Sequence, residues 1–478
     1  MDMNKLREAA SRIWNAETLP ALKTFVSRES LSTDFDPEWE KHGILNEVCR
    51  EAAAWGTRML PRGTYDVQQE PGRTPALIFS VPGTGLYAGR EEDTVFFYGH
   101  LDKQPPATGW SEGLGPFTPV VRDGKLYGRG CSDDGYSVYA ALTAIRALED
   151  AGIPHPRAVG LIETREESGS NDLEHYLKKN AARFGSPRLV CVLDSGAGNY
   201  EQLWLTSSLR GACAIDLNVR VLRQGMHSGT ASGVVPSSFD VLRILLDRIQ
   251  DPRTGAILDP AFNVEIPSNR MDDMKKTSEV LGDGFISEFP WAEGPNGSVQ
   301  SRCRGTEEAL IARCWKPTLS VTGAAGLPPL SMAGNSLRSD TTLRLSFRLP
   351  PTAKTENILP ALQKKLLTDP PFNAVVSIAG GDALPGWNAP SEADWFRSAC
   401  DESSKALWGK PAMRIGEGGS IPILNLFEAQ FPRAQFAVTG VLGPGSNAHN
   451  ADESLDLAYT EKFIAAVGYL AASIPEEA

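Results

Sequence analysis

Four short, continuous apolar runs in this chain end at an acidic residue or a histidine, or directly before a loop that carries one. They are residues 94–98 (TVFFY) before Gly99 and His100, 158–162 (AVGLI) before Glu163, 189–193 (LVCVL) before Asp194, and 435–441 (QFAVTGV) before the loop with His449. Such runs predict strands buried on both faces, as in a sheet covered by helices. Ligands of open α/β sheets bind beyond the carboxyl ends of the strands, so these polar residues stand where a site is expected.

The middle of the chain has a different pattern. Residues 212–221 and 342–349 alternate between apolar and polar, which predicts strands with one exposed face. Helical patterns at 237–249 and 356–367 accompany them. We therefore predict an α/β protein with a helix-covered, mostly parallel-sheet catalytic domain and an inserted α+β domain, in which 251–330 is an extended elaboration. The predicted boundaries are 1–208 and 386–478 for the catalytic domain and 209–385 for the insert.

Composition narrows the choice of partners and compartment. The formal charge of −12 argues against nucleic acid or an anionic membrane surface as the main partner. The seven cysteines are scattered, without a C-x-x-C pair, as is usual for a reducing cytoplasm. No apolar run approaches eighteen residues, and residues 1–25 predict an amphipathic helix without a signal core. We expect a cytoplasmic protein with no membrane span.

Several polar segments have a structural explanation when each is taken alone. His100 in His-x-Asp, with Asp102, could be a strand-end histidine bonded to backbone. The Asp133–Asp134 pair could cap the helix that follows it. The Glu166–Glu167 pair in a Gly/Ser loop is less easily explained, because one carboxylate can bind metal while its neighbour acts as a general base.

Together these segments place two imidazoles and at least three carboxylates at the ends of predicted strands. So much negative charge at one sheet edge is costly unless cations balance it. Mixed histidine and carboxylate ligands suit Zn²⁺, Mn²⁺ or Co²⁺. Five ligands with one shared carboxylate would hold two ions about 3.5–4 Å apart.

The ordered motifs resemble one family over most of the chain, from about Ile44 onward. They are GHLD, GRGCSDDG, ETREESGSNDL, CVLDSG, GMHSG and GPGSNAH. This set is similar to the dinuclear metallopeptidases that include carnosine and cytosolic nonspecific dipeptidases, aminoacylases, succinyl-diaminopimelate desuccinylases and glutamate carboxypeptidases. The resemblance is greatest to the dipeptidase branch, through TGWSEGLGPF, RDGKLYGRG and GEGGSIP.

The resemblance implies a role for each motif residue. Glu166 would be the general base for attack by a hydroxide that bridges two divalent ions, most simply Zn²⁺, with Mn²⁺ or Co²⁺ as alternatives. Asp102 would orient His100. The implied metal ligands are His100 and Asp194 for one ion, Glu167 and His449 for the other, and Asp133 between them.

The inserted domain resembles the family's ferredoxin-like lid and dimerisation domain. In the family, the histidine that His227 matches reaches the active site of a partner subunit, where it polarises the scissile carbonyl or stabilises the tetrahedral oxyanion. Arg348 matches the arginine that grips a substrate carboxylate. Asn335 and Ser420 would help at the ends of the substrate, although both could also be turn or capping residues. A homodimer is therefore implied.

The chain departs from the family pattern after its aspartate pair. Family members usually have D-D-K-G, whereas Gly135 follows Asp134 directly and the lysine is absent. The peptide between the two aspartates is often cis in the family. The metal ligand is retained, but the geometry of this loop could differ.

The expected activity is hydrolysis of the amide bond of dipeptides or short peptides. A deacylase or desuccinylase of N-acyl amino acids, or a glutamate-type carboxypeptidase, would use the same centre. A serine hydrolase is disfavoured because no serine stands in G-x-S-x-G. A non-catalytic binding protein on the same fold should have lost a ligand or the base, and none is lost.

Overall fold

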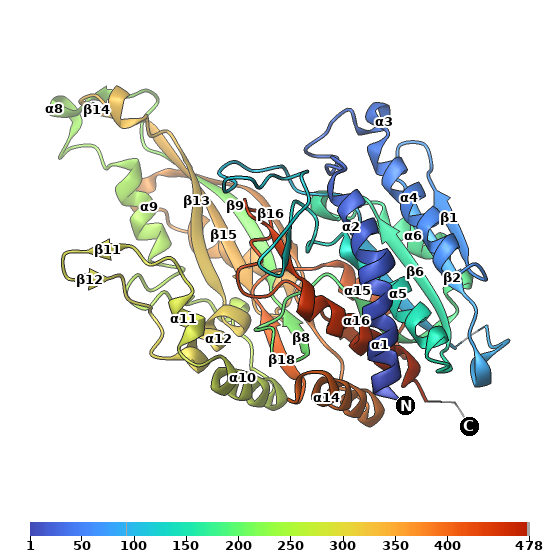
Figure 1. Cartoon of the computed structure of the whole chain (residues 1–478). Helices are drawn as coiled ribbons and strands as arrows, with labels where there is room; N and C mark the ends of the chain where they lie inside the picture. The colour runs from blue at the N-terminus through green and yellow to red at the C-terminus, as the bar shows by residue number, and fades with distance from the viewer. Residues whose placement is uncertain (92, 476–478) are drawn as a thin grey trace. The chain divides into compact units, whose positions relative to one another are not determined.

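The computed structural model describes residues 1–91 and 93–475. These residues form two compact units (Figure 1). The first contains Met1–Thr206, Ala389–Ile415 and Ile423–Ala478, and the second contains Ser207–Asn388 and Gly416–Pro422. The segment with Ser420, which the predicted boundaries assign to the catalytic domain, lies in the second unit.

The first unit is built on a six-stranded sheet in the order β1-β2-β6-β3-β7-β19. The pairs β6–β3, β3–β7 and β7–β19 are parallel, while β1–β2 and β2–β6 are antiparallel, so the sheet is mixed. All four predicted apolar runs lie in the parallel part. The strands are β1 (Thr64–Gln68), β2 (Ala76–Val81), β3 (Asp93–His100), β6 (Arg157–Glu163), β7 (Ser186–Val192) and β19 (Gln435–Val438).

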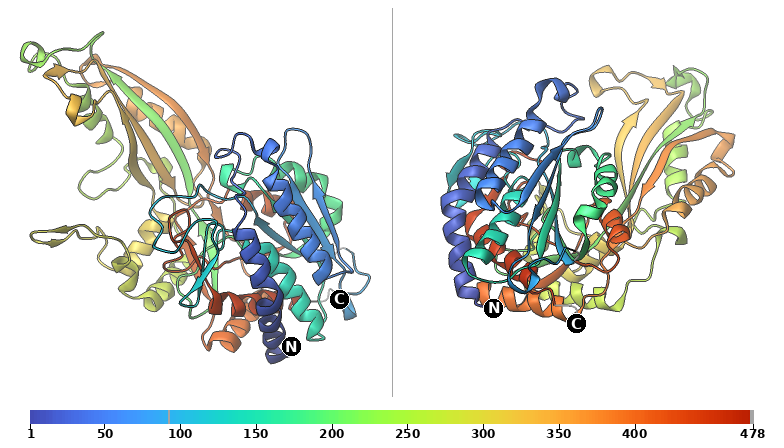
Figure 2. Two further views of the ribbon diagram at one scale, coloured as in Figure 1. Left: turned by 45° about the horizontal axis from the view of Figure 1, so that its top comes forward. Right: turned by 90° about the vertical axis from the view of Figure 1, so that its right-hand side faces the viewer.

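Helices cover both faces of this sheet, which explains why β6 is buried at every position. Helix α5 (Tyr136–Asp150) packs on β3 and against α1 (Met3–Ile13) and α16 (Leu457–Ala472). The two terminal helices thus lie side by side, as Figures 1 and 2 show. On the opposite face, Phe96 of β3 packs against Phe427 of α15 (Ile423–Gln430) with ring centroids 5.3 Å apart.

The remaining elements of the first unit complete this cover and extend its edge. A small sheet in the order β20-β5-β4 joins two distant parts of the chain. Helices and small-sheet strands are α2 (Leu19–Val26), α3 (Trp39–His42), α4 (Ile44–Met59), α6 (Leu173–Lys179), α7 (Ala181–Phe184), α14 (Asp394–Trp408), β4 (Val120–Arg122), β5 (Lys125–Tyr127) and β20 (Ser454–Asp456).

The second unit contains an antiparallel sheet in the order β13-β15-β9-β16, comprising β13 (Thr318–Ala325), β15 (Asp340–Leu349), β9 (Gly211–Arg220) and β16 (Val375–Leu384). Strands β9 and β15 alternate between buried and less buried residues, as their sequences predict. Their buried face forms a core with α9 (Ser238–Leu246) and α13 (Ile358–Leu367). On the other face Arg344 pairs with Asp216 at 2.7 Å.

The elaboration at 251–330 is more regular than its composition indicates. It contains α10 (Ser268–Leu281), α11 (Gly284–Ser287), the hairpin of β11 (Glu293–Gly294) and β12 (Gly297–Ser298), and α12 (Thr306–Trp315). It also supplies β13, an edge strand whose sequence predicts no burial. Short elements elsewhere are β8 (Trp204–Leu209), β10 (Met226–His227), α8 (Ser228–Ala231), β14 (Ser336–Leu337), β17 (Trp387–Asn388) and β18 (Met413–Glu417).

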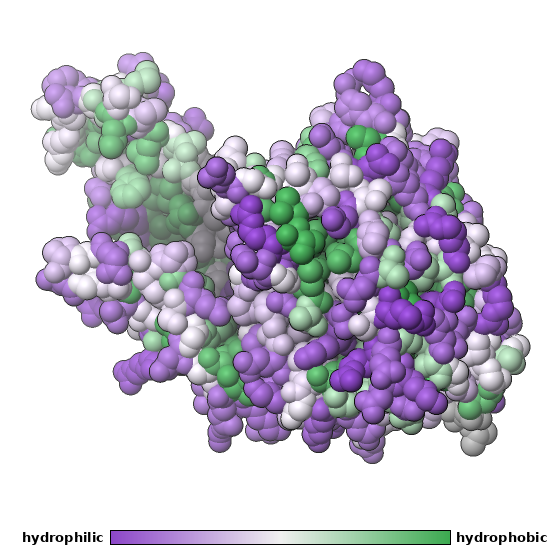
Figure 3. All heavy atoms as spheres, viewed as in Figure 1, coloured by the Kyte–Doolittle hydropathy of each residue, from purple (hydrophilic) through white to green (hydrophobic). Residues whose placement is uncertain are grey.

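All seven cysteines are free thiols. Among residues 1–91 and 93–475, no helix is both long enough and apolar enough to cross a membrane. Most of the surface visible in Figure 3 is hydrophilic, with hydrophobic residues in a few patches.

Candidate metal centre

Two groups of metal-type side chains meet in the first unit, and Asp133 belongs to both. One group is His100, Asp133 and Asp194, and the other is Asp133, Glu167 and His449. Within each group the nearest ligand atoms all lie within 4.8 Å of one another. The five residues proposed as ligands from the sequence are thus brought together from five separate segments of the chain.

The local structure explains this convergence. His100 ends β3, and Asp194 follows the neighbouring parallel strand β7 by two residues. Glu167 lies in the 3₁₀ turn η3 (Glu166–Ser168) beyond the end of β6. Asp133 precedes α5, and His449 lies in the loop after β19. The carboxyl ends of parallel strands meet at one sheet edge, so their following residues converge there.

The two oxygens of Asp133 face different histidines. Its Oδ1 lies 3.4 Å from His100 Nε2, and its Oδ2 lies 2.9 Å from His449 Nε2. His100 Nε2 is also 3.8 Å from Asp194 Oδ2, while His449 Nε2 is 3.4 Å from Glu167 Oε2. One carboxylate that faces two imidazoles in this way can bind two cations at once.

The buried Nε2 of His100 also supports a metal site at this position. His100 is fully buried, and its Nε2 has no hydrogen-bond partner among the described residues. It nevertheless points at two carboxylates, which a divalent ion between them would satisfy. The donors are nitrogen and oxygen only, a set that fits Zn²⁺, Mn²⁺ or Co²⁺.

Asp102 links the two halves of the site. Its Oδ1 is 3.3 Å from His100 Nδ1, on the side of the ring that faces away from the ligand group. The same carboxylate accepts hydrogen bonds from the backbone N–H groups of Glu166 at 3.1 Å and Glu167 at 3.0 Å. Asp102 can therefore orient both the imidazole and the turn that carries the glutamate pair.

Burial and crowding perturb the carboxylates. Burial raises the pKa of Asp194 to about 6 and that of Glu167 to about 10, and the charge of Asp133 adds to both effects. Burial also raises the pKa of Glu166 well above its ordinary value, although His100 opposes the shift. Glu166 Oε2 lies 4.0 Å from His100 Nε2, so this carboxylate borders the ligand group.

Two contacts at the site were not predicted. Gln104 Nε2 donates a 2.7 Å hydrogen bond to Glu167 Oε2, and Asp134 Oδ2 accepts one of 3.2 Å from the backbone N–H of His100. Gln104 is only two residues from Asp102, and that proximity is the one sequence signal that could have indicated it. The peptide between Asp133 and Asp134 is cis, as the resemblance implies.

Gly135, which stands where the family usually has lysine, is tightly enclosed. A Cβ at this position would lie 1.8 Å from Cε1 of Phe25 and 2.7 Å from the carbonyl oxygen of Gly130. The ring of Phe25 and the neighbouring backbone therefore leave no room for a side chain. The departure from the family pattern matches the packing of α2 against this loop.

The other four predicted residues lie in the second unit, in two pairs. His227 of β10 is exposed and pairs with Ser336 of β14, next to Asn335. Arg348 Nη1 donates a 3.2 Å hydrogen bond to Ser420 Oγ. The Ser420 hydroxyl in turn donates to the carbonyl oxygen of Arg210 at 2.5 Å, so Ser420 supports the position of Arg348.

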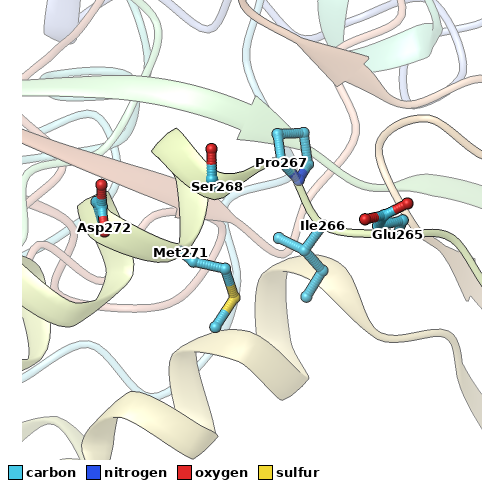
Figure 4. Close-up of a pocket in the computed structure, with 6 residues that line it drawn as sticks. All are labelled: Glu265, Ile266, Pro267, Ser268, Met271 and Asp272. Atoms are coloured by element: carbon cyan, nitrogen blue, oxygen red, sulfur yellow. The ribbon is translucent and has the colours of Figure 1, made fainter.

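A pocket in the second unit is lined by none of the residues predicted for the catalytic, metal or substrate site. It lies at the start of α10, and its lining is Glu265, Ile266, Pro267, Ser268, Met271 and Asp272 (Figure 4). Its two carboxylates have no histidine or cysteine beside them in this lining. It is therefore not part of the candidate metal centre.

Comparison with known proteins also supports a metal-dependent peptidase. The family described as Peptidase family M20/M25/M40 matches residues 96–474. The chain is 26% identical over 473 residues to the Cys-Gly metallodipeptidase dug1 of Schizosaccharomyces pombe, covering 96% of this chain and 95% of the relative. It is also 26% identical over 459 residues to the Beta-Ala-His dipeptidase of Homo sapiens, covering 91% and 86%.

Solved structures share the fold. Human carnosine dipeptidase 1 superimposes with a TM-score of 0.73 at 21% identity, covering 99% of both chains. The M20 family metallo-carboxypeptidase Sso-CP2 from Sulfolobus solfataricus gives a TM-score of 0.75 at 21% identity, covering 96% of this chain and 99% of that one.

Proposed function

Because this chain belongs to peptidase family M20/M25/M40 and is therefore a peptidase, we propose that it hydrolyses the amide bond of dipeptides or short peptides. The observation that carries the proposal is the pair of ligand groups that share Asp133. The names of the relatives support a dipeptide substrate, since they are described as Cys-Gly and Beta-Ala-His dipeptidases.

In this proposal His100 and Asp194 would hold one divalent ion, Glu167 and His449 would hold the second, and Asp133 would help to hold both. Two ions held there, most simply Zn²⁺, would polarise the substrate carbonyl and make water more acidic. Asp102 keeps the His100 ring turned toward Asp133 and Asp194 through its contact with Nδ1.

Glu166 is the proposed general base. Its carboxylate borders the ligand group and takes a proton from the attacking water, then delivers it to the leaving amine. Without bound ions, burial raises the pKa of Glu166, and two cations beside it would lower that pKa and favour the carboxylate that a base requires.

The second unit would supply substrate contacts and serve as a lid and dimerisation domain. The guanidinium of Arg348, supported by Ser420, is suited to bind a substrate carboxylate with two hydrogen bonds. Asn335 would contact the other end of the substrate. His227 is exposed, and we propose that it serves the active site of a second copy of the chain in a homodimer.

The substitution Glu166→Ala tests the mechanism. We expect turnover to fall by about 10²- to 10⁴-fold, the usual contribution of a general base, while metal content stays unchanged. Metal analysis of the purified variant would accompany the kinetic assay. Glu174→Ala is the matched control, since Glu174 is exposed and pairs with Lys178 on α6. Near-normal turnover of Glu166→Ala would refute the assignment.

Substrate class is tested with a panel of dipeptides, N-acyl amino acids and longer peptides, each with Zn²⁺ and with Mn²⁺. Preferred cleavage of dipeptides supports the proposal. Preferred release of C-terminal residues from longer peptides, or deacylation of acyl amino acids, would replace it with the corresponding activity on the same centre.

The shared site is tested by mixing chains that carry His227→Ala with chains that carry Glu166→Ala. If His227 serves the partner's centre, each mixed dimer has one centre with both residues intact, and activity returns in part. A proven mixed dimer that stays inactive would contradict the proposed role of His227.

A further inference from the structure

A buried ion pair lies behind the ligand groups, and neither of its members is a proposed ligand or a proposed substrate contact. Arg129 and Glu453 are 1% and 0% exposed, and Arg129 Nη1 lies 2.7 Å from Glu453 Oε2. Removing two charges from water is costly, and an apolar pair of similar size often stabilises a fold as well or better. The pair therefore calls for an explanation other than stability.

Glu453 binds the loop that presents Asp133. Its Oε1 accepts hydrogen bonds from the backbone N–H groups of Ser132 at 3.2 Å and Asp133 at 3.3 Å. The Ser132 hydroxyl donates to the same oxygen at 3.2 Å, and the N–H of Gly130 donates at 3.0 Å. The backbone on the N-terminal side of the shared ligand is thus fixed by one carboxylate.

Arg129 binds two further loops of the site. Its Nη2 donates to the carbonyl oxygen of Asn450 at 3.0 Å, directly after His449, and its Nε donates to that of Pro105 at 3.0 Å, directly after Gln104. Glu453 is itself only four residues beyond His449. One ion pair therefore connects the loops of Asp133, His449 and Gln104, and Gln104 contacts Glu167.

The ion pair supports the loops of all three ligands in the group of Asp133, Glu167 and His449, whereas in the other group it supports only the shared Asp133. His100 pairs with Glu163 in the register of β3 and β6, and Asp194 lies two residues beyond the last pair of β7 with β3. His449 lies in a loop with a positive φ of 64°, a conformation uncommon for a residue with a side chain. Its backbone needs support that no strand provides.

We propose that Arg129 and Glu453 are positioning residues that set the affinity of the ion held by Asp133, Glu167 and His449 more strongly than that of the ion held by His100, Asp194 and the shared Asp133. This inference rests on the proposed two-metal function. The pair acts through the ligand loops and does not touch the substrate.

The test is a titration of the metal-free full-length chain with Co²⁺, followed by its visible absorption. The unmodified chain should bind two equivalents. In Glu453→Gln, which keeps the size of the side chain and removes its charge, the first equivalent should bind only slightly more weakly, because it shares Asp133. The second should bind about 10- to 100-fold more weakly, the usual cost of losing a residue that supports metal ligands.

Glu392→Gln is the matched control. Glu392 accepts two hydrogen bonds from Arg414 in the same unit, at 2.9 and 3.0 Å, in an ion pair whose arginine is buried and whose glutamate is partly buried. This variant should lose thermal stability and bind both equivalents normally. Equal weakening of both equivalents in Glu453→Gln, or equal weakening in the control, would overturn the inference, because either would indicate a general loss of structure.

Ser132→Ala provides a second variant if Glu453→Gln does not fold. It removes only the hydroxyl that donates to Glu453 Oε1, and it should weaken the second equivalent several-fold. Unchanged binding in this folded variant would count against the inference. If the unmodified chain binds no Co²⁺, the proposed function itself fails, and that result is distinct from a normal titration that the variants leave unaltered.

Discussion

The two ligand groups around Asp133 differ in how the fold holds them. His100 is fully buried at the end of β3, and Asp194, 8% exposed, follows β7. His449 has a half-exposed side chain and lies in a loop, and Glu167 lies in a short turn. We call His100 and Asp194 the strand group, and Glu167 and His449 the loop group. The strand group takes its position mainly from the sheet, with Asp102 beside His100, whereas the loop group depends on side-chain contacts from Gln104, Asp102 and the Arg129–Glu453 pair.

This difference leads us to expect unequal affinities. A site whose ligands are already held in place loses less conformational freedom when an ion binds, so the strand group should bind more tightly than the loop group. The loop group should then exchange its ion more readily. Substitutions of the ligands and of the residues that support them test whether the two affinities differ.

Asp133→Asn should have the largest effect, because Asp133 is the one ligand that both groups share. We expect both ions to be lost and activity to fall by about 1000-fold or more, since metal ions contribute several kcal/mol to this chemistry. Elemental analysis and a dipeptidase assay measure the two effects. Retention of one tightly bound ion would show that one group does not need Asp133.

Removal of one unshared ligand from each group should give unequal results. Glu167→Ala should keep about one ion per chain, since the strand group is intact, while Asp194→Ala should keep less than one at micromolar free metal. Equilibrium dialysis against Zn²⁺ measures both variants. Equal occupancy in the two, or the reverse order, would contradict the proposed difference between the groups.

Asp102→Asn should have a moderate effect on both groups. The variant weakens the contact with His100 Nδ1 and the acceptors for the N–H groups of Glu166 and Glu167. We expect affinity to fall about 10- to 100-fold for each ion. A Co²⁺ titration distinguishes this result from Glu453→Gln, where the second equivalent should weaken much more than the first.

The smallest expected effect is the change in stability of the metal-free chain with pH. The raised pKa values of Asp194, about 6, and Glu167, about 10, mean that the folded chain keeps protons that the unfolded chain releases above about pH 4. The raised pKa of His100 acts in the same direction. The stability of the metal-free chain should therefore fall as the pH rises from 5 to 7, by an amount on the order of 2 kcal/mol.

Thermal unfolding in the presence of a chelator measures this slope. The pKa of Asp133 is lowered, and its opposite contribution changes mainly below about pH 4, outside the window. Asp194→Asn should reduce the slope, and an excess of Zn²⁺ should abolish it. A metal-free chain that gains stability between pH 5 and 7 would contradict the expectation.

The strand group could be predicted from sequence because its causes are local. A continuous apolar run predicts a buried strand, and His100 and Asp194 follow such runs immediately. The motif resemblance then indicated the loop ligands. Strand β13 was not predicted, since residues of an exposed edge strand carry no clear alternation.

The support of the loop group could not be predicted, because its contacts are long-range. The hydrogen bond from Asp133 to Glu453 joins residues 320 positions apart, and nothing in the sequence around Glu453 indicates that its side chain is buried. Likewise, the absence of a lysine after Asp134 is explained only by the folded structure, in which the ring of Phe25 fills the space beside Gly135.

The free cysteines give a practical route to the dynamics of the molecule. Six are buried, and only Cys303, in the second unit, is partly exposed. Buried thiols with raised pKa values react slowly, so a maleimide fluorophore should modify Cys303 first. A second dye on a cysteine placed at Lys41, 74% exposed on α3 of the first unit, would make energy transfer report the separation of the two units during turnover.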